Sequence, residues 1–365
     1  MDNLSKAVDD VYSRTKINRD LIEQHLRALE VARKLQEIDE NLILFGGTAA
    51  QFYLPFNLQR TSTDVDMITN YQYNKYKTII TRFCEENPGY KLTRPEKDLA
   101  GAYGKRFYLK IILDSGIEHS INLEIVSRSK EKLKKNSIDN CSLYGTNLGK
   151  FILLTKEDIF AKKLVTFDLD RYGIKTKSKA DKLKLPLKIG KQCWDINQLY
   201  NIFEKREFEI IGERICTQIK NEMAIKEEED ELDPSIENIC NAFDSLSLIG
   251  SKKEKSISKF MKKGFSVVKS HLPRNPPITL QEWASSGWNF QHLIKSAQID
   301  NTNSGNANVL NHYNIRVRCK NDQVYERRVR GEVAHQLGEK SREFKIGGKP
   351  TYSLIFKLEL INNFK

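Results

Sequence analysis

The sequence has few cysteines, and they follow no recognisable spacing. Six cysteines occur among 365 residues without any Cys-x-x-Cys pair, so the chain predicts neither a zinc site nor a disulfide framework and favours a reducing compartment. Long apolar runs are missing too, and none approaches the ~20 residues that span a membrane. The N-terminal residues, MDNLSKAVDD, are too polar and acidic for a signal peptide. We therefore expect a cytoplasmic protein that does not contact a membrane.

Acidic residues are in deficit relative to basic ones. Lysine and arginine number 60 against 48 aspartates and glutamates, which gives a formal charge of +12 and a pI near 9.2. This charge favours a polyanionic partner, above all nucleic acid, although a lysine-rich genome produces the same bias. With 39% hydrophobic and 30% charged residues the chain is globular, and its length suits two or three domains.

One stretch of the chain combines two features that are weak when taken alone. A short apolar run, Leu42–Phe45, predicts a buried strand that leads into Gly46 and Gly47 and then into a helix-prone segment. A second apolar strand follows, and it begins with Asp64 and Asp66. Residues two apart on a strand point to the same face, so these two carboxylates are expected to lie together.

Each feature has a structural and a functional interpretation. Paired glycines let the backbone approach a ligand closely, and the N–H groups of a following helix can bind phosphate, but such a pair is more often a tight turn. Neighbouring carboxylates repel one another unless a cation lies between them, and Mg²⁺ is held by one or two carboxylates together with substrate phosphates. An Asp-x-Asp is nevertheless more often a solvated strand end. Only the combination predicts a site for a nucleoside triphosphate.

The residues of both features follow one another in a fixed order, Gly46-Gly47-Thr48 and then Arg60-x-Ser62-x-Asp64-x-Asp66. This order resembles the signature of polymerase-β-like nucleotidyltransferases, and more narrowly that of the AbiEii/AbiGii-type toxins. The resemblance covers about residues 40–205. It implies that Arg60 and Ser62 orient the aspartates or contact phosphate.

The resemblance also implies a chemistry for the remaining motif residues. Gly46, Gly47 and Thr48 would bind the phosphates of an NTP. Asp64 and Asp66 would hold two Mg²⁺ ions, which bind the attacking and leaving oxygens of an in-line displacement. The implied reaction is transfer of a nucleoside monophosphate to an acceptor hydroxyl, with pyrophosphate as the second product.

A third carboxylate is expected from a later strand. Arg106–Leu113 and His119–Ser127 predict strands, and Asp114-Ser115-Gly116 between them suits a hairpin turn. Glu124 lies inside the second strand, where it could simply face solvent. In polymerase-β-like enzymes a third carboxylate comes from the strand beside the Asp-x-Asp strand. The resemblance thus implies that Glu124 completes the metal site or acts as the base, with Asp114 as the alternative.

A helical segment carries the second part of the resemblance. Thr155 with Asp158 predicts a capped helix start. The helix continues with Ala161-Lys162-Lys163-Leu164, which is similar to the A-x-K-L pattern of the AbiEii family, and Lys163 is the implied contact to nucleotide phosphates. The family then places an aspartate in a phrase like R-D-L-Y-D-L, which falls on Asp195. The family often has two aspartates in this phrase, and this chain has only one. Without the resemblance, a single lysine or aspartate on a helix would usually be interpreted as an exposed residue with no functional role.

Other parts of the chain yield broader predictions. Residues 2–40 predict a helix whose apolar stripe contains His25 as a packed core residue. Gly173–Gly190 is lysine-rich with Asp181 as its single acidic residue, which is typical of a solvated loop. Since it lies between two candidate site motifs, a mobile basic loop over acceptor nucleic acid, with salt-dependent binding, is the alternative. Gln298–Asn311 resembles a linker.

The C-terminal part changes character. Tyr313–Cys319, Val324–Val329 and Tyr352–Leu360 predict strands rich in arginine. They could form a small basic β module that binds an acceptor, or an oligomerisation element, and no motif favours one over the other.

The predicted fold class is α+β. We expect a polymerase-β-like nucleotidyltransferase core with an N-terminal helix over residues 1–150, and a mainly helical domain that completes the active site over 151–300. A β-rich basic module would follow over 301–365. By resemblance to type IV toxins, the protein would act on tRNA beside a separately encoded antitoxin. The alternatives are a nucleotidyltransferase that modifies a protein or small molecule, and a catalytically silent nucleic-acid-binding protein on the same fold.

Overall fold

The structure is a computed structural model, and the residues it describes are 2–99, 104–128, 133–167, 179–203, 217–223, 236–247, 256–273, 290, 312–318, 324–330 and 355–357. The chain divides into two compact units, which are described separately. The first consists of Met1–Glu204 with Arg214–Lys295, and the second of Lys205–Glu213 with Ser296–Lys365. The predicted α+β fold class is confirmed, because a mixed sheet and helices together build the first unit.

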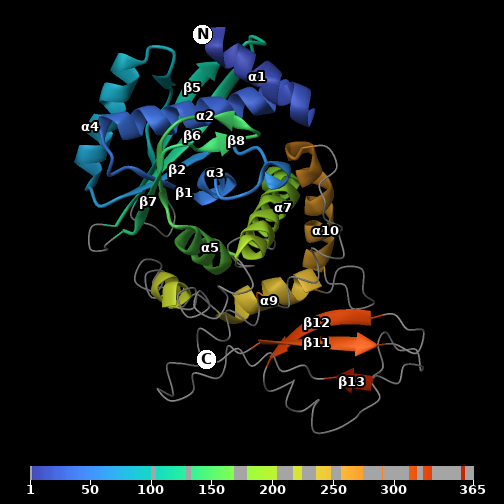
Figure 1. Cartoon of the computed structure of the whole chain (residues 1–365). Helices are drawn as coiled ribbons and strands as arrows, with labels where there is room; N and C mark the ends of the chain where they lie inside the picture. Colours follow the sequence, from blue (N-terminus) through green and yellow to red (C-terminus); the bar gives the residue numbers. More distant parts are fainter. Residues whose placement is uncertain are drawn as a thin grey trace. The chain divides into compact units, whose positions relative to one another are not determined.

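A mixed sheet forms the centre of the first unit (Figure 1). Its strands lie in the order β3-β5-β6-β2-β1-β10-β7, and β4 pairs with β5 outside this path. Strand β2 runs antiparallel to β1 and parallel to β6. The strands are β1 (Ile43–Phe45), β2 (Val65–Thr69), β3 (Lys91–Leu92), β4 (Lys97–Asp98), β5 (Gly104–Ile112), β6 (Glu118–Ser127), β7 (Lys135–Ile138) and β10 (Phe151–Leu154). A separate hairpin joins β8 (Ser142–Leu143) to β9 (Thr146–Asn147).

The N-terminal region contains two helices where the sequence predicts one. Helix α1 (Asp2–Thr15) ends where the Thr15 hydroxyl donates to the Val11 carbonyl oxygen at 2.9 Å and accepts from the amide N–H of residue 17 at 3.2 Å. Lys16 then adopts a left-handed backbone with φ of +59°. Helix α2 (Arg19–Ile38) starts anew at Asn18, whose side chain accepts from a backbone N–H of the first turn. The prediction of one continuous helix over 2–40 is therefore wrong.

Helices cover one face of the sheet. Helix α2 contacts β2, β6 and β10, and it also packs against α4 (Tyr73–Glu86). Its apolar stripe is buried, and His25 lies in it fully buried, as the periodicity predicts. Burial lowers the pKa of His25 well below its usual value, and Arg60 lowers it further, so this histidine is neutral at pH 7.

Four further helices build the other side of the first unit: α3 (Gly46–Gln51), α5 (Lys156–Val165), α7 (Lys179–Ile202) and α10 (Ser256–Val268). Helix α3 contacts both α5 and α7, and α7 contacts α10 (Figure 1). Further elements are α9 (Ile236–Ser247), the helical residues 217–223, and the 3₁₀ turns η1 (Phe56–Leu58) and η2 (Lys269–His271). In the described part of the chain, no helix is both long and apolar enough to cross a bilayer.

Two predictions about this side of the unit have different outcomes. The capped start of α5 is confirmed, because the Thr155 hydroxyl oxygen accepts from the Asp158 amide N–H at 3.3 Å. The prediction of a basic loop over Gly173–Gly190 is partly wrong, because residues 179–190 form the first half of helix α7. The remainder of that loop, residues 173–178, lies outside the described residues.

The second unit contains a three-stranded antiparallel sheet in the order β12-β11-β13. Its strands are β11 (His312–Arg318), β12 (Val324–Arg330) and β13 (Ile355–Lys357), and Ile315 pairs with Arg327 across the central pair. The three predicted strands are thus present, and of the third the structure describes Ile355–Lys357. The linker-like segment Gln298–Asn311 lies outside the described residues.

Helices α7 and α10 approach one another through two glycines. A Cβ atom on Gly190 would lie 2.4 Å from the carbonyl oxygen of Gly264, and a Cβ on Gly264 would lie 2.4 Å from the carbonyl oxygen of Pro186. Real Cβ atoms do not approach backbone this closely, so only glycine allows the two backbones to come so near. This crossing fixes the position of α7, which carries Asp195.

We predict that Gly264→Ala destabilises the protein by about 1–3 kcal/mol, because the new methyl group forces the two helix backbones apart. In an ordinary helix the same change stabilises by about 0.5–1 kcal/mol. The measurement is the free energy of unfolding in urea. The control is Ser266→Ala at an exposed position of the same helix, which should change stability by less than about 0.5 kcal/mol. A stabilised Gly264→Ala protein would show that the crossing is not close.

Candidate active site

A cavity of about 570 Å³ opens over the sheet face that carries the paired aspartates. Acidic and basic side chains both line it. The acidic ones are Asp64, Asp66, Glu124 and Glu222, and the basic ones are Arg60, Arg106, Arg128, Lys162, Lys163, Lys188 and Lys191. Gly46, Gly47 and Ser62 line it as well. Most of the predicted site residues are thus brought together in one cavity.

Three charged residues form a row across neighbouring strands. Asp66 on β2 is the direct partner of Glu124 on β6, and Glu124 is the direct partner of Arg106 on β5. Alternation along a strand puts these side chains on one face, whereas Val65 and Met67 are fully buried toward the other. Glu124 therefore lies beside the Asp-x-Asp strand.

Crowding among the carboxylates changes the protonation of Asp66. Burial together with the negative charges of Glu124 and Asp64 raises the pKa of Asp66 to about 8. The positive charge of Lys163 and the backbone N–H of Gly47 act in the opposite direction. In the absence of a bound cation, Asp66 therefore carries a proton for much of the time at pH 7.

The paired glycines let the backbone pass directly over Asp66. Gly46 has φ of +74°, and a Cβ atom there would lie 2.0 Å from Asp66 Oδ2. The next residue, Gly47, gives its N–H to the same carboxylate. The sequence assigns these glycines to phosphate binding, and in the structure their immediate neighbour is the Asp66 carboxylate.

Asp64 lies at the exposed edge of the cavity. Its carboxylate accepts from Asn122 Nδ2 at 2.8 Å, and its carbonyl oxygen accepts from the buried hydroxyl of Thr48 at 2.6 Å. Thr48 therefore joins α3 to the start of β2. The alternative third carboxylate, Asp114, is not among the residues that line the cavity. It accepts from Ser5 Oγ at 2.5 Å.

The donor chemistry of this face suits a hard divalent cation, although the ligand set is incomplete. Carboxylate oxygens are the ligands that Mg²⁺ prefers, and a cation between Asp64 and Asp66 would relieve the repulsion that raises the pKa of Asp66. Within the described residues, however, no three acidic, histidine or cysteine side chains are already arranged to hold a metal ion. Glu124 is engaged elsewhere, because Arg106 Nε donates to its Oε1 at 2.8 Å.

A second charge cluster closes the cavity from the helical side. Asp195 is fully buried and accepts from Arg60 through Nε at 2.8 Å and Nη2 at 2.5 Å. Lys163 Nζ lies 2.8 Å from Asp195 Oδ2, and Gln51 Nε2 donates to Oδ1 at 3.2 Å. Burial favours the neutral acid, but Arg60 and Lys163 outweigh it and lower the pKa of Asp195, which is therefore ionised.

The segment before Asp64 is held in place by buried side chains. The Arg60 amide N–H donates to Gln51 Oε1 at 2.8 Å, and the Thr61 amide N–H donates to the His271 carbonyl oxygen at 2.9 Å. Trp194, next to Asp195, is fully buried and donates through Nε1 to the carbonyl oxygen of residue 58 at 3.0 Å. Helix α7 is thereby fixed to the segment that leads into the Asp-x-Asp strand.

Several residues of the cavity have no counterpart in the sequence motifs. Arg106 could have been found, because a turn over 114–116 pairs residue 112 with 118 and therefore 106 with 124. Lys191 lines the cavity one helical turn before Asp195, and burial together with the charge of Arg60 lowers its pKa to about 8. Glu222, which pairs with Lys162, comes from residues with no local motif, so the sequence offers no signal for it.

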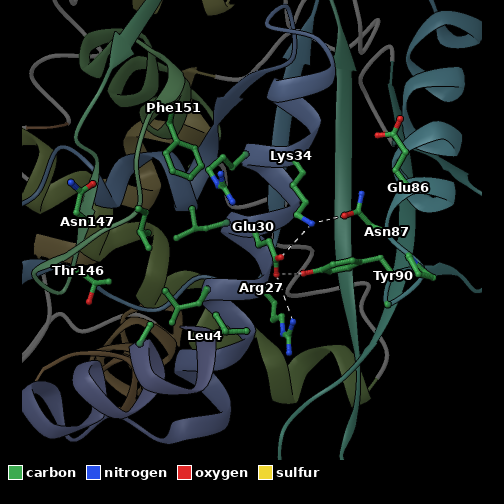
Figure 2. Close-up of a pocket in the computed structure, with 17 residues that line it drawn as sticks. Leu4, Arg27, Glu30, Lys34, Glu86, Asn87, Tyr90, Thr146, Asn147 and Phe151 are labelled. Carbon is green, nitrogen blue, oxygen red and sulfur yellow. Dashed lines mark hydrogen bonds and ion pairs between the residues drawn. The ribbon is translucent and has the colours of Figure 1, made fainter. Parts of the chain in front are cut away.

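A second cavity, of about 600 Å³, lies beside α2 and the segment that follows α4 (Figure 2). Its charged groups already bind one another. Glu30 accepts from the Tyr90 hydroxyl at 2.5 Å and lies 3.6 Å from both Arg27 and Lys34. Lys34 also donates to Asn87 Oδ1 at 2.5 Å. Because opposite charges are matched here, we place the candidate active site in the first cavity, where carboxylates repel one another.

We predict that Asp195→Asn destabilises the protein by about 3–5 kcal/mol, because the change leaves the buried cations of Arg60 and Lys163 without their counter-ion. Urea unfolding at pH 7 measures this effect. The control is Glu37→Gln, which breaks an exposed pair with Arg33 and should cost about 0.5 kcal/mol or less. Equal losses in the two variants would mean that the buried cluster contributes no more than a surface pair.

Comparisons with known proteins show which family the chain matches. Residues 27–271, two thirds of the chain, match the family described as the nucleotidyl transferase AbiEii toxin of type IV toxin–antitoxin systems. Among solved structures, a crystal structure described as a candidate nucleotidyltransferase from H. pylori is similar, with a TM-score of 0.40 and 18% identity. The similarity covers 78% of this chain and 99% of that one. No curated protein was found to match.

The match spans every residue that lines the cavity, from Phe45 to Glu222. It includes Asp66 and Glu124, and it includes the buried cluster around Asp195. The chain belongs to the AbiEii family of nucleotidyltransferase toxins.

Proposed function

We propose that the cavity over Asp64 and Asp66 transfers a nucleoside monophosphate from an NTP to an acceptor hydroxyl. The observation that carries this proposal is the row of carboxylates on neighbouring strands, whose charges add to the effect of burial and raise the pKa of Asp66 to about 8. Natural sequences rarely keep repelling carboxylates side by side unless a ligand uses them. A silent nucleic-acid-binding protein would have no use for such repulsion.

Magnesium is the cation that we propose for this site. Asp64 and Asp66 would hold two ions, and Glu124 would join them once it is free of Arg106. When bound, the two ions stabilise negative charge on the attacking and leaving oxygens. The ions also allow Asp66 to ionise at neutral pH.

The residues of the chain position the reactants for an in-line displacement. The acceptor oxygen forms a bond to the α-phosphorus, the bond between that phosphorus and the bridging oxygen breaks, and pyrophosphate leaves. The proton of the acceptor hydroxyl passes to a carboxylate, for which Glu124 is our candidate. The Gly46–Gly47 backbone and Ser62 line the cavity and would contact the triphosphate.

In this proposal Arg60 and Lys163 have a structural role in addition to the contacts that the motifs suggest. Both are bound to Asp195, so they hold the cavity wall in place and lend positive charge to it. Lys163 also acts on Asp66 electrostatically, since its charge lowers the pKa of that carboxyl. We propose that Lys163 contacts the phosphates while it remains paired with Asp195, because an ammonium group has three donors.

We propose tRNA as the acceptor and the cytoplasm as the place of action. The charge of +12 and the excess of basic side chains in the cavity favour a polyanionic acceptor. Membership of a type IV toxin–antitoxin family supports a growth-arresting toxin with a cognate antitoxin.

The first test is a labelling reaction. We predict that purified protein with Mg²⁺ and one of the four α-labelled NTPs labels total tRNA. Asp64→Asn should reduce this activity by ~10²-fold or more, because the exposed carboxylate that binds the cation is lost. Asp114→Asn, an exposed carboxylate outside the cavity, should leave the activity unchanged.

The outcome also separates the acceptor classes. Label on the protein itself, or on an added protein or small molecule, would show that the acceptor is not tRNA. The type of reaction would still be the proposed one. If Asp64→Asn labels tRNA as well as the natural sequence does, the proposed site is wrong.

The second test is the pH dependence of stability without metal. Between pH 3.8 and about 8 the unfolded chain has lost the Asp66 proton while the folded chain keeps it, so stability falls as pH rises through this window. We predict that Asp66→Asn removes a slope of at most ~1.4 kcal/mol per pH unit. In a chelating buffer at pH 8, Asp66→Asn should therefore be more stable than the natural sequence.

Magnesium should reverse this order, because it binds the ionised carboxylates of the natural sequence and stabilises the folded state. Urea unfolding at several pH values, with EDTA or with Mg²⁺, measures both effects. Asp114→Asn is the control and should follow the natural sequence in each buffer. Parallel pH profiles for Asp66→Asn and the natural sequence would contradict the raised pKa.

A further inference from the structure

Arg106 contacts one of the three carboxylates of the active site. Its Nε donates to Glu124 Oε1 at 2.8 Å, and its Nη2 lies 2.5 Å from the same oxygen. Among the described residues, this is the only ion pair that any of Asp64, Asp66 and Glu124 makes. Arg106 thus occupies the carboxylate that the cation needs as its third ligand.

The pairing uses one carboxylate oxygen. Arginine usually binds a carboxylate through two parallel hydrogen bonds to both oxygens, and that arrangement is the strong one. Here both contacts fall on Oε1, so Oε2 of Glu124 stays outside this pair. A cation can therefore reach Glu124 before Arg106 has left it.

The pair is also exposed enough to break readily. The side chain of Arg106 is 41% exposed and that of Glu124 is 27% exposed. Water screens such a pair, and exposed ion pairs contribute little to stability. A divalent cation that lies between several carboxylates attracts Glu124 more strongly than Arg106 does.

The position of Arg106 gives it a second partner. It lines the same cavity as Gly46 and Gly47, where the proposed triphosphate lies. A guanidinium group matches phosphate oxygens in geometry as well as in charge. Once the cation holds Glu124, Arg106 would keep its charge on the cavity side and lose its anionic partner.

We propose that Arg106 is a two-position residue, which binds Glu124 in the free protein and moves to a phosphate of the nucleotide when the cation takes Glu124. This inference rests on the proposed function and assigns to the site a positioning residue outside the motifs. Arg106 therefore opposes binding of the cation alone and favours binding of the nucleotide with the cation.

The two effects have opposite signs, which makes the test specific. In Arg106→Gln, we expect Mn²⁺ alone to bind about two- to fivefold more tightly, since Glu124 is released from an exposed pair. We expect an α,β-methylene NTP with saturating Mn²⁺ to bind about tenfold more weakly, since a charge-assisted contact is lost. The measurements are an EPR titration of free Mn²⁺ and calorimetry of each of the four nucleotide analogues with the full chain.

A matched control comes from the same two strands. Lys110 on β5 pairs with Glu118 on β6, and neither lines the cavity. Lys110→Gln should change neither affinity. In the double variant Arg106→Gln/Glu124→Gln, the tighter binding of Mn²⁺ should disappear, because it depends on the freed carboxylate.

The possible outcomes separate the two proposals. If the natural sequence binds Mn²⁺ and one nucleotide analogue, but Arg106→Gln shifts both affinities in the same direction or neither, the inference is overturned and the proposed function stands. If the natural sequence binds neither ligand, both are overturned. Thermal unfolding of Arg106→Gln close to that of the natural sequence excludes misfolding as the cause.

Discussion

A buried carboxylate, Asp195, holds the active site together. It accepts from Arg60 at two positions and lies 2.8 Å from Lys163, so it ties the segment before the Asp-x-Asp strand to helices α5 and α7. All three side chains are buried, and removing Asp195 would leave two buried cations without their counter-ion. This cluster is the reason why the sheet alone cannot form the cavity and why the helical region after it is needed.

The cavity therefore contains two charge clusters with opposite properties. Around Asp195, cations surround the carboxylate and lower its pKa, and the cluster is complete without a ligand. Around Asp66, burial and the facing carboxylates together raise its pKa, so the neighbouring cations balance the negative charges of this cluster only in part. The first cluster provides a rigid wall, and the second is the cluster that we propose binds metal and nucleotide. A ligand binds well when the residues that contact it are held in place by rigid neighbours.

Local signals in the sequence predict much of this. Alternation predicts β6, the Asp-Ser-Gly turn joins it to β5, and the resemblance to polymerase-β-like enzymes implies that Glu124 lies beside Asp66. Longer-range features leave no such signal. Arg60 and Asp195 are 135 residues apart, and nothing near either residue indicates that both are buried and paired. The break at Lys16 was missed for a different reason, because the apolar stripe continues across it while a single left-handed residue ends the helix.

The two ion pairs at the cavity show how burial decides the role of an arginine. Arg60 is almost completely buried and bound to Asp195 through two hydrogen bonds, so releasing it would leave a buried guanidinium group without its counter-ion. Arg106 is 41% exposed and bound through one carboxylate oxygen, so water replaces its partner at little cost. The same residue type thus serves as a fixed support at one wall and as an exchangeable partner at the other. An arginine that must remain in place is buried, and one that must exchange partners lies where solvent reaches it.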